Sequence, residues 1–362
     1  MRMNLFKVRV LPIGIDVGSA FVKVAQLQRR DDKLELLETA RVALPEQCRQ
    51  DNAKKVDFLA DFLRDLLKNR RFRGRRCIIS LPASDTFLQH VKIAKVPTDR
   101  LAKALRWELE GKLPFKIDEA VIRHVVVGEV HNEREVGLEV IVVATRRETV
   151  DMYLRMANRG KLDVIGLDIE PCAILECFAR LLHRETDRSR ATLFLDLGRS
   201  STQVVISHGP KLVFARNIMY GSDKIDAAAA SALEMSLEDV KVLREKCMAV
   251  EDESASEFAL FYDAIGEAIE EQVSEINKSL RYYESIFPTR PVQRAIFLGG
   301  QAMDKRLCQT IARRLNLPSQ IGDPFVRVSA PDEGGEVDAF QARPMWAVAV
   351  GLGLGAELTK VA

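Results

Sequence analysis

The sequence has no apolar run long enough to cross a membrane as a helix. Such a helix needs about 20 apolar residues. The nearest candidate in this chain of 362 residues, residues 345–354, is short and contains glycines. Residues 1–9 are basic but lack the apolar core of a secretory signal, because Arg9 and Asp16 interrupt the apolar run. We therefore expect a cytoplasmic protein without a transmembrane segment.

The sequence also lacks a large excess of positive or negative charge. The 54 Lys and Arg residues nearly balance the 52 Asp and Glu residues, which gives a formal net charge of +2 and argues against general nucleic-acid binding. The six cysteines contain no C-x-x-C pair, so we expect no metal or redox site from them. Free, mostly buried thiols in a reducing compartment are the default. The length allows two or more domains.

One pattern occurs twice, in residues 12–27 and in residues 192–206, about 180 residues apart. Each stretch contains an apolar strand, an Asp-x-Gly turn with small hydroxyl residues, and a second apolar strand. The aspartates are Asp16 and Asp196. The pattern predicts a phosphate-binding β-hairpin, because Gly leaves the backbone N–H groups open to a phosphate and the carboxylate suits the water shell of Mg²⁺. A single turn of this kind is common, but its recurrence predicts two similar half-domains.

A third glycine turn follows later in the chain. Residues 295–303 contain an apolar strand that ends at Gly299 and Gly300, ahead of a predicted helix over residues 304–315. Paired glycines leave bare backbone against which a nucleoside can lie. The turn therefore predicts the adenosine side of a nucleotide site.

These motifs, in this order, resemble those of the superfamily of actin, sugar kinases and DnaK-type ATPases, and residues 169–173 are similar to the segment connecting its two halves. The resemblance implies an α/β fold of the actin-like ATPase type, with two RNase H-like halves around a nucleotide cleft, and ATP and Mg²⁺ as cofactors. It places Asp16 and Asp196 at a Mg²⁺ held through water, and makes Asp16, Asp196 and Glu170 the catalytic candidates if ATP is hydrolysed. Glu170 has a second interpretation, as an acidic residue at a helix start. The implied nucleotide contacts are Asp16, Gly18, Ser19, Ala20, Lys23, Asp196, Gly198, Arg199, Ser200, Ser201, Thr202, Gly221, Lys241, Arg244, Gly299, Gly300, Gln301, Ala302 and Met303.

A narrower resemblance comes from residues 82–165, whose order of strands and helices predicts an inserted α+β module of about 80 residues. Its position, and the stretches 107–119, 140–146, 167–173 and 214–225, resemble the type IV pilus assembly protein PilM family, in the FtsA/PilM branch of the superfamily, over nearly the whole chain. The resemblance implies a first half at 1–81 (subdomain 1A), the inserted subdomain 1C at 82–165, the rest of 1A at 166–190, the first part of 2A at 191–226, subdomain 2B at 227–292, and the rest of 2A with a return helix at 293–362.

The family resemblance also implies a function. It implies a cytoplasmic ATP-binding scaffold, with slow or no ATPase activity, that lies at the inner membrane through protein partners. Those partners are the N-terminal cytoplasmic tail of a PilN-like membrane protein and the pilus assembly ATPase complex, and self-association stays open. Residues 86–95 and 121–130 are candidate strands for tail binding, although an interior-facing strand has the same pattern. The alternatives are an FtsA-like membrane-associated filament protein, which a membrane-binding tail would mark, and a small-molecule kinase, which substrate-stimulated ADP production would mark.

Five positions depart from the family pattern. Arg199 replaces a small residue in the second hairpin, and Ser222 and Asp226 stand where Gly and Thr are usual. Lys241 and Arg244 align with a Glu and a Lys that flank the nucleoside, so a carboxylate is missing there. These departures predict weaker or altered nucleotide binding.

Three further patterns make local predictions. Residues 70–76 contain five arginines and are predicted to form a solvated helix end and turn, with contact to anionic lipid or an acidic partner as the alternative. The apolar stripe of residues 257–283 predicts one long helix. Thr98 is predicted to be the N-cap of a helix over residues 99–109.

Overall fold

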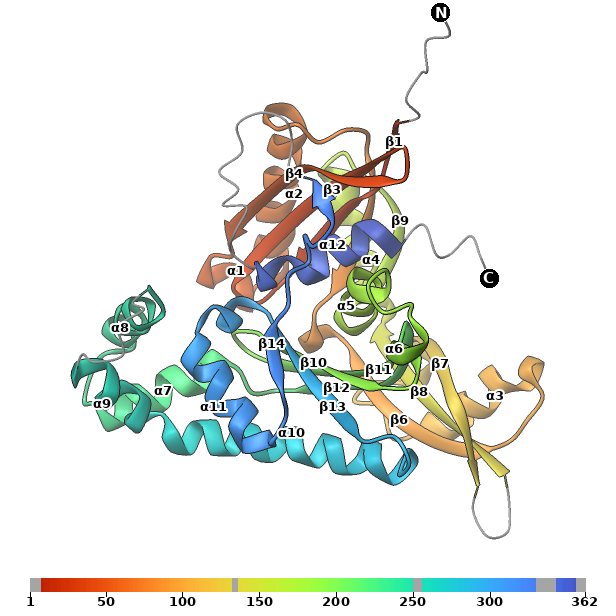
Figure 1. Cartoon of the computed structure of the whole chain (residues 1–362). Coiled ribbons are helices and arrows are strands. Elements are labelled where there is room, and N and C mark those ends of the chain that lie inside the picture. The colour runs from red at the N-terminus through yellow and green to blue at the C-terminus, as the bar shows by residue number, and fades with distance from the viewer. Residues whose placement is uncertain (1–7, 132–135, 250–255, 330–342, 356–362) are drawn as a thin grey trace, which may run out of the picture.

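Three β-sheets organise the computed structural model, which describes residues 8–131, 136–249, 256–329 and 343–355 (Figure 1). The two larger sheets form the centres of the two halves, and the third belongs to the inserted stretch. Helices α5 (Glu170–Ala179) and α12 (Ala347–Gly355) lie between the larger sheets in Figure 1. Within the described ranges, no helix has the length and apolar character needed to cross a membrane.

The first sheet contains the first predicted hairpin, because β2 and β3 pair antiparallel with Asp16 opposite Lys23. The next strand in this sheet, β5, pairs parallel with β2. Ile15, Val22 and Ile79 from these strands are buried against the helices α2 and α4. The sheet order is β15-β4-β3-β2-β5-β9, with β1 beside β3. The bounds are β1 (Val8–Val10), β2 (Ile13–Val17), β3 (Phe21–Arg30), β4 (Lys33–Ala43), β5 (Arg76–Leu81), β9 (Asp163–Ile169), β15 (Val328–Ser329), α1 (Glu46–Gln50), α2 (Asn52–Asn69) and α4 (Arg147–Arg159).

The second sheet repeats this arrangement around the second predicted hairpin. β10 pairs antiparallel with β11 and parallel with β13, as β2 pairs with β3 and β5. The repeated sequence pattern therefore corresponds to two similar hairpin-plus-parallel-strand units, as predicted. The sheet order is β12-β11-β10-β13-β14. The bounds are β10 (Ala191–Leu197), β11 (Thr202–His208), β12 (Lys211–Ile218), β13 (Val292–Leu298), β14 (Ser319–Ile321), α6 (Glu185–Arg188), α7 (Ser222–Ala232), α8 (Leu237–Ala249), α9 (Ser256–Ala264), α10 (Gly266–Ile286) and α11 (Lys305–Leu315).

The inserted stretch forms a separate sheet of order β6-β8-β7, covered on one face by α3. Its strands are β6 (Phe87–Ala94), β7 (Ala120–His131) and β8 (Val136–Arg146), and α3 is Thr98–Leu109. Helix α4, at the end of the stretch, packs in the core of the first sheet instead, because Tyr153 and Met156 are buried there. The exact subdomain boundaries stay a prediction.

Two close helix contacts hold the centre of the molecule together. Helix α12 packs directly on β2 and on α5, and glycines make both approaches possible. A Cβ on Gly351 would lie 1.8 Å from the Ala173 carbonyl oxygen of α5, and one on Gly14 would lie 2.0 Å from the Ala349 carbonyl oxygen of α12. A change in the angle between the halves would therefore have to be accommodated at this tightly packed crossing.

Two local predictions are wrong. The predicted helix over residues 257–283 is two helices, α9 and α10, because the backbone leaves helical geometry at Ile265 (φ −95°, ψ 3°). The apolar stripe continues through this bend, so periodicity does not reveal it. Thr98 is not an N-cap, because Pro97 holds extended backbone (φ −54°, ψ 146°) and Thr98 is already the first residue of α3.

Candidate functional site

The two hairpin turns and the glycine turn line one cavity of about 470 Å³ between the halves. This size lies within the range of small-ligand pockets. Its wall contains the catalytic candidate Glu170 and most of the predicted nucleotide contacts: Asp16, Gly18, Ser19, Ala20, Lys23, Asp196, Gly198, Arg199, Ser201, Lys241, Arg244, Gly299, Gly300, Gln301 and Met303.

Asp16 is a deeply placed carboxylate of the site, with 2% of its surface exposed. Its side chain forms an ion pair with the Lys23 ammonium, from the facing strand of the same hairpin. The Ser80 hydroxyl, from β5, donates to Asp16 Oδ1 at 3.4 Å and accepts from the Val17 backbone N–H at 3.1 Å. Burial lowers the pKa of Lys23, but the negative charges of Asp16, Asp196 and Glu170 outweigh this and raise it above the ordinary value. Lys23 therefore stays cationic at neutral pH.

Two further carboxyls that act on Lys23, those of Asp196 and Glu170, have raised pKa values. Burial raises the pKa of Asp196 to about 6, with Lys23 opposing and Asp16 adding to the shift. Burial, with Asp16 and Asp196, raises the pKa of Glu170 well above its ordinary value. The amide of Gln203 donates to Glu170. Three carboxyls and one ammonium thus meet in a largely desolvated space, which makes their charge states sensitive to any added cation.

The glycine turn brings backbone unusually close to this group. Gly299 has φ +86°, and a Cβ there would lie 2.3 Å from Asp196 Oδ1 and 2.5 Å from the Leu197 carbonyl oxygen. Only a glycine fits both the conformation and the space. The cavity therefore has a bare-backbone wall directly beside the second carboxylate.

Both hairpin turns close in the same way. The Gly18 N–H donates to the Phe21 carbonyl at 3.1 Å, and the Gly198 N–H donates to the Ser201 carbonyl at 3.0 Å. In the described part of the chain, the backbone N–H groups of Ser19 and Ala20 have no protein acceptor, and both residues line the cavity. Unpaired N–H groups in a turn are suited to an anion. Together with the carboxyls and the bare backbone, they fit a metal-bound nucleotide.

Four predicted contacts lie outside the cavity wall: Ser200, Thr202, Gly221 and Ala302. Thr202 is fully buried, and its hydroxyl donates to the Tyr220 carbonyl at 2.7 Å and accepts from Gln272 at 2.9 Å. Gly221 packs against the second hairpin, since a Cβ there would lie 2.3 Å from the Arg199 carbonyl oxygen. Thr202 and Gly221 shape the hairpin from behind the cavity.

Three of the five residues that depart from the family pattern, Arg199, Asp226 and Arg244, form ion pairs beside the site. Arg199 pairs with Asp223 at 2.7 Å, which links the second hairpin to α7. Arg244 pairs with Asp226 at 2.9 Å, which links α8 to α7. The carboxylate predicted to be missing from α8 has a neighbouring substitute, because Glu245 also lines the cavity.

Several lining residues were not among the predicted nucleotide contacts, although Ser222 and Asp226 were noted as departures from the family pattern. They are Phe21, Arg41, Leu197, Gln203, Ser222, Asp226, Glu245, Met248 and Met345. A helical spacing of four from Lys241 to Glu245 is a signal for one of them. Arg41 and Met345 have no local signal, since tertiary contacts bring them together (Arg41 Nη1 lies 3.6 Å from Met345 Sδ).

Within the described ranges, no group of three or more His, Cys, Asp or Glu residues is arranged to bind a metal ion directly. Mg²⁺ commonly keeps several waters and binds through one or two carboxylates plus phosphates, so Asp16 and Asp196 fit that mode. The six cysteines are free and five are buried, as predicted.

Comparison with known proteins identifies relatives of this fold. The family described as type IV pilus assembly protein PilM matches residues 14–357. Among solved structures, a PilM-PilN type IV pilus biogenesis complex is 24% identical with a TM-score of 0.79, over 96% of this chain and 98% of that one. EutJ of Carboxydothermus hydrogenoformans, an ethanolamine utilization protein, is 11% identical with a TM-score of 0.54, over 96% and 89%. MreB5 of Spiroplasma citri bound to AMPPNP is 10% identical with a TM-score of 0.54, over 98% and 97%. These likenesses confirm the predicted actin-like ATPase fold. No curated protein matches the sequence.

Proposed function

The chain belongs to the type IV pilus assembly protein PilM family, and from this premise we propose that it is a cytoplasmic ATP-binding scaffold of the type IV pilus machine. The observation that carries the nucleotide part is the shared cavity of Asp16 and Asp196, which come from equivalent hairpins of the two halves. In this proposal the scaffold binds the tail of a PilN-like membrane protein and links it to the pilus assembly ATPase, so it lies at the inner membrane through its partners.

The cavity residues divide into three roles in this proposal. The turns at residues 18–20 and 198–201 would hold the phosphates, and Gly299 and Gly300 would face the nucleoside. Asp16 and Asp196 would hold Mg²⁺ through water, and the bound ion would supply charge neutralisation of the triphosphate. Since ATP would touch both halves, it would favour one angle between them.

We propose slow or absent hydrolysis, and the surroundings of Glu170 support this part of the proposal. A general base must be ionised to accept a proton from water. The raised pKa of Glu170 favours the protonated carboxyl, and the Gln203 amide occupies one of its oxygens. We therefore propose that nucleotide binding, rather than rapid turnover, is the working state.

Mg²⁺-dependent ATP binding should strengthen with pH between 5 and 7. Burial raises the pKa of Asp196 to about 6, so its ionised fraction rises from about 0.1 to about 0.9 over this interval, roughly a tenfold change. The ligand-free chain should show the opposite trend. A carboxyl with a raised folded-state pKa stabilises the fold most below its unfolded pKa, and this stabilisation is lost as the pH rises through 6.

Isothermal titration with Mg²⁺ and a non-hydrolysable ATP analogue at pH 5, 6 and 7 measures the first trend, and urea unfolding without ligand measures the second. Asp196→Asn is the matched control, because it removes the titrating group while the analogue keeps its own titration. It should bind weakly with a flatter pH dependence. The same pH dependence in wild type and Asp196→Asn would contradict the role of this carboxyl.

For the tail of the PilN-like partner, we propose the β7 side of the inserted sheet. The second half packs on one face of this sheet, where the His90 ring of β6 accepts from the Ala215 N–H at 3.3 Å and Val127 of β7 is buried. In the described part of the chain, β7 has no strand on its outer edge. The side chain of Val126 on this strand is 40% exposed, and Trp107 on the neighbouring α3 is 74% exposed. An edge strand beside exposed apolar side chains suits capture of an extended peptide.

Val126→Asp should weaken binding of a fluorescein-labelled peptide copied from the tail of a PilN-like protein by at least about tenfold, because it places a charge at an apolar contact. Fluorescence anisotropy measures this. Val242→Asp is the matched control, since Val242 is a similarly exposed valine on α8. Equal affinity of Val126→Asp and wild type would refute this surface and leave the nucleotide proposal intact.

A further inference from the structure

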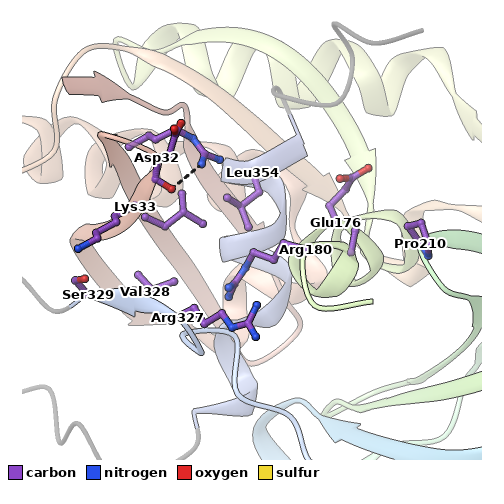
Figure 2. Close-up of a pocket in the computed structure, with 12 residues that line it drawn as sticks. Asp32, Lys33, Glu176, Arg180, Pro210, Arg327, Val328, Ser329 and Leu354 are labelled. Atoms are coloured by element: carbon purple, nitrogen blue, oxygen red, sulfur yellow. Dashed lines mark hydrogen bonds between the residues drawn. The ribbon is translucent and has the colours of Figure 1, made fainter. Parts of the chain in front are cut away.

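A second and larger cavity, of about 900 Å³, opens at the far ends of the central helices (Figure 2). We call it the rear pocket. It is bounded by the β3–β4 turn, the last turn of α5, the end of α12, the β11–β12 turn and β15. The rear pocket therefore touches the first half, the second half and both central helices. Its wall consists of Arg29, Asp32, Lys33, Leu34, Glu176, Ala179, Arg180, Pro210, Arg327, Val328, Ser329 and Leu354.

The wall of the rear pocket has an excess of cations. Arg180 and Arg327 lie close together in Figure 2, and the charge of Arg327 adds to burial in lowering the pKa of Arg180. Within the described ranges, neither Arg327 nor Lys33 forms an ion pair with a carboxylate. Like charges held together in this way repel each other until an anion joins them.

Arg180 is also incompletely satisfied. Its two terminal nitrogens donate to the carbonyls of Pro324, at 2.9 Å, and Val326, so they anchor the turn that carries Arg327. Its Nε is buried and has no hydrogen-bond partner among the residues that the structure describes. A buried guanidinium N–H without an acceptor is costly, and an acceptor atom of a ligand would remove that cost.

The acidic residues of the wall do not cancel this charge. Burial, with Asp168 adding, raises the pKa of Glu176 to about 7, so this carboxyl is about half protonated at neutral pH. One of its oxygens is also buried, with no hydrogen-bond partner in the described ranges. Asp32 is exposed in the β3–β4 turn, and its backbone carbonyl accepts from Arg29 at 3.2 Å.

The remaining wall is apolar except for Ser329. Leu34, Val328 and Leu354 belong to this lining, and Pro210 adds a ring from the second half. A small inorganic anion would leave this surface in water. A ligand that fits the whole space carries an anionic group for the arginines and an apolar body for the leucines and valine.

From these observations we propose that the rear pocket is a second ligand site, which binds a phosphate ester with an apolar body. The phosphate would lie at Arg180 and Arg327, and the body would lie against Leu34, Val328 and Leu354. Such a ligand is either a soluble ester or the headgroup end of a phospholipid, which share this chemistry.

The position of the rear pocket suggests a consequence for the nucleotide cavity between the halves, which we call the front cavity. This part rests on the proposed function. Helix α5 begins with Glu170 in the nucleotide cavity and ends with Glu176 and Ala179 in the rear pocket. The segment of Met345 and α12 likewise links the front cavity to Leu354 in the rear pocket. A ligand that bridges the halves from behind would therefore change ATP affinity, and ATP would change its affinity by the same factor.

Isothermal titration with phenyl phosphate tests the site. Saturable binding is expected for wild type, with at least tenfold weaker binding of inorganic phosphate, which has no apolar body. Arg327→Gln should weaken phenyl phosphate binding at least tenfold, because it removes one of the two neighbouring guanidinium groups. The Arg327 side chain is exposed, so its loss should leave the fold intact. Lys103→Gln, an exposed lysine of α3, is the matched control and should bind like wild type.

A front-cavity variant separates this proposal from the nucleotide site. Arg244→Gln should leave phenyl phosphate binding unchanged even if it weakens ATP binding. Loss of phenyl phosphate binding in Arg244→Gln with full binding in Arg327→Gln would overturn the proposal, as would inorganic phosphate binding as tightly as the ester. Co-sedimentation with phosphatidic acid vesicles that Arg327→Gln abolishes would assign the phosphate to a lipid, and binding of the soluble ester alone would assign it to a free ester. Failure of both overturns the site.

Discussion

Asp16→Asn is expected to reduce the affinity for ATP in the presence of Mg²⁺ at least about a hundredfold, which corresponds to about 2.7 kcal/mol. Asp16 is almost fully buried, faces the cavity and is the ion-pair partner of Lys23. The amide has nearly the same shape but no charge, so the water shell of Mg²⁺ loses one of its two anionic contacts. Titration of a fluorescent ATP analogue with and without Mg²⁺ measures the effect.

Asp151→Asn is the control for the same chemical change, because Asp151 is exposed on α4, away from the cavity. It should bind the analogue like wild type. The melting temperature of Asp16→Asn has to be measured in parallel, so that loss of binding is compared between folded chains. Equal, Mg²⁺-dependent affinity of folded Asp16→Asn and wild type would contradict the nucleotide site.

Gly351→Ala is expected to lower the free energy of unfolding by about 3 kcal/mol, at the upper end of the cost of overpacking a core. The added Cβ would lie 1.8 Å from the Ala173 carbonyl oxygen, so α5 and α12 must separate. Helix propensity alone predicts that the substitution raises the free energy of unfolding, because Ala stabilises a helix by about 1 kcal/mol relative to Gly. Urea unfolding therefore distinguishes the packing of the crossing from local helix preference.

Gly266→Ala provides the comparison. Gly266 is also a helical glycine, at the start of α10, but a Cβ there meets nothing within 4 Å. This variant should be as stable as wild type or slightly more stable. If Gly351→Ala were stabilised to the same extent, the close crossing of α5 and α12 would be wrong. The proposed coupling between the front cavity and the rear pocket would then lack the rigid helix pair on which it depends.

The sequence predicts the two hairpins well because their signals are local. In each, an apolar run, an Asp-x-Gly turn and a second apolar run follow one another within about fifteen residues. The recurrence of the pattern also predicts that the halves are alike. The glycine turn at Gly299 is predicted for the same reason, although its closeness to Asp196 is visible only in the fold.

Other parts of the site depend on contacts between distant segments, which local patterns do not report. Met345 and Arg41 meet across the site although about 300 residues separate them. Thr202 belongs to a predicted motif, yet its side chain turns away to Tyr220 and Gln272. The bend at Ile265 is hidden by a continuous apolar stripe. The rear pocket is assembled from five separate segments, none of which has a motif of its own.

A crystal structure of the chain with Mg²⁺ and AMPPNP tests the central claim most directly. We predict one nucleotide between the two halves, with its phosphates at the turns of residues 18–20 and 198–201 and with waters of the Mg²⁺ bonded to both Asp16 and Asp196. A nucleotide bound in another place, or a Mg²⁺ whose water shell reaches only one of these carboxylates, would contradict the account.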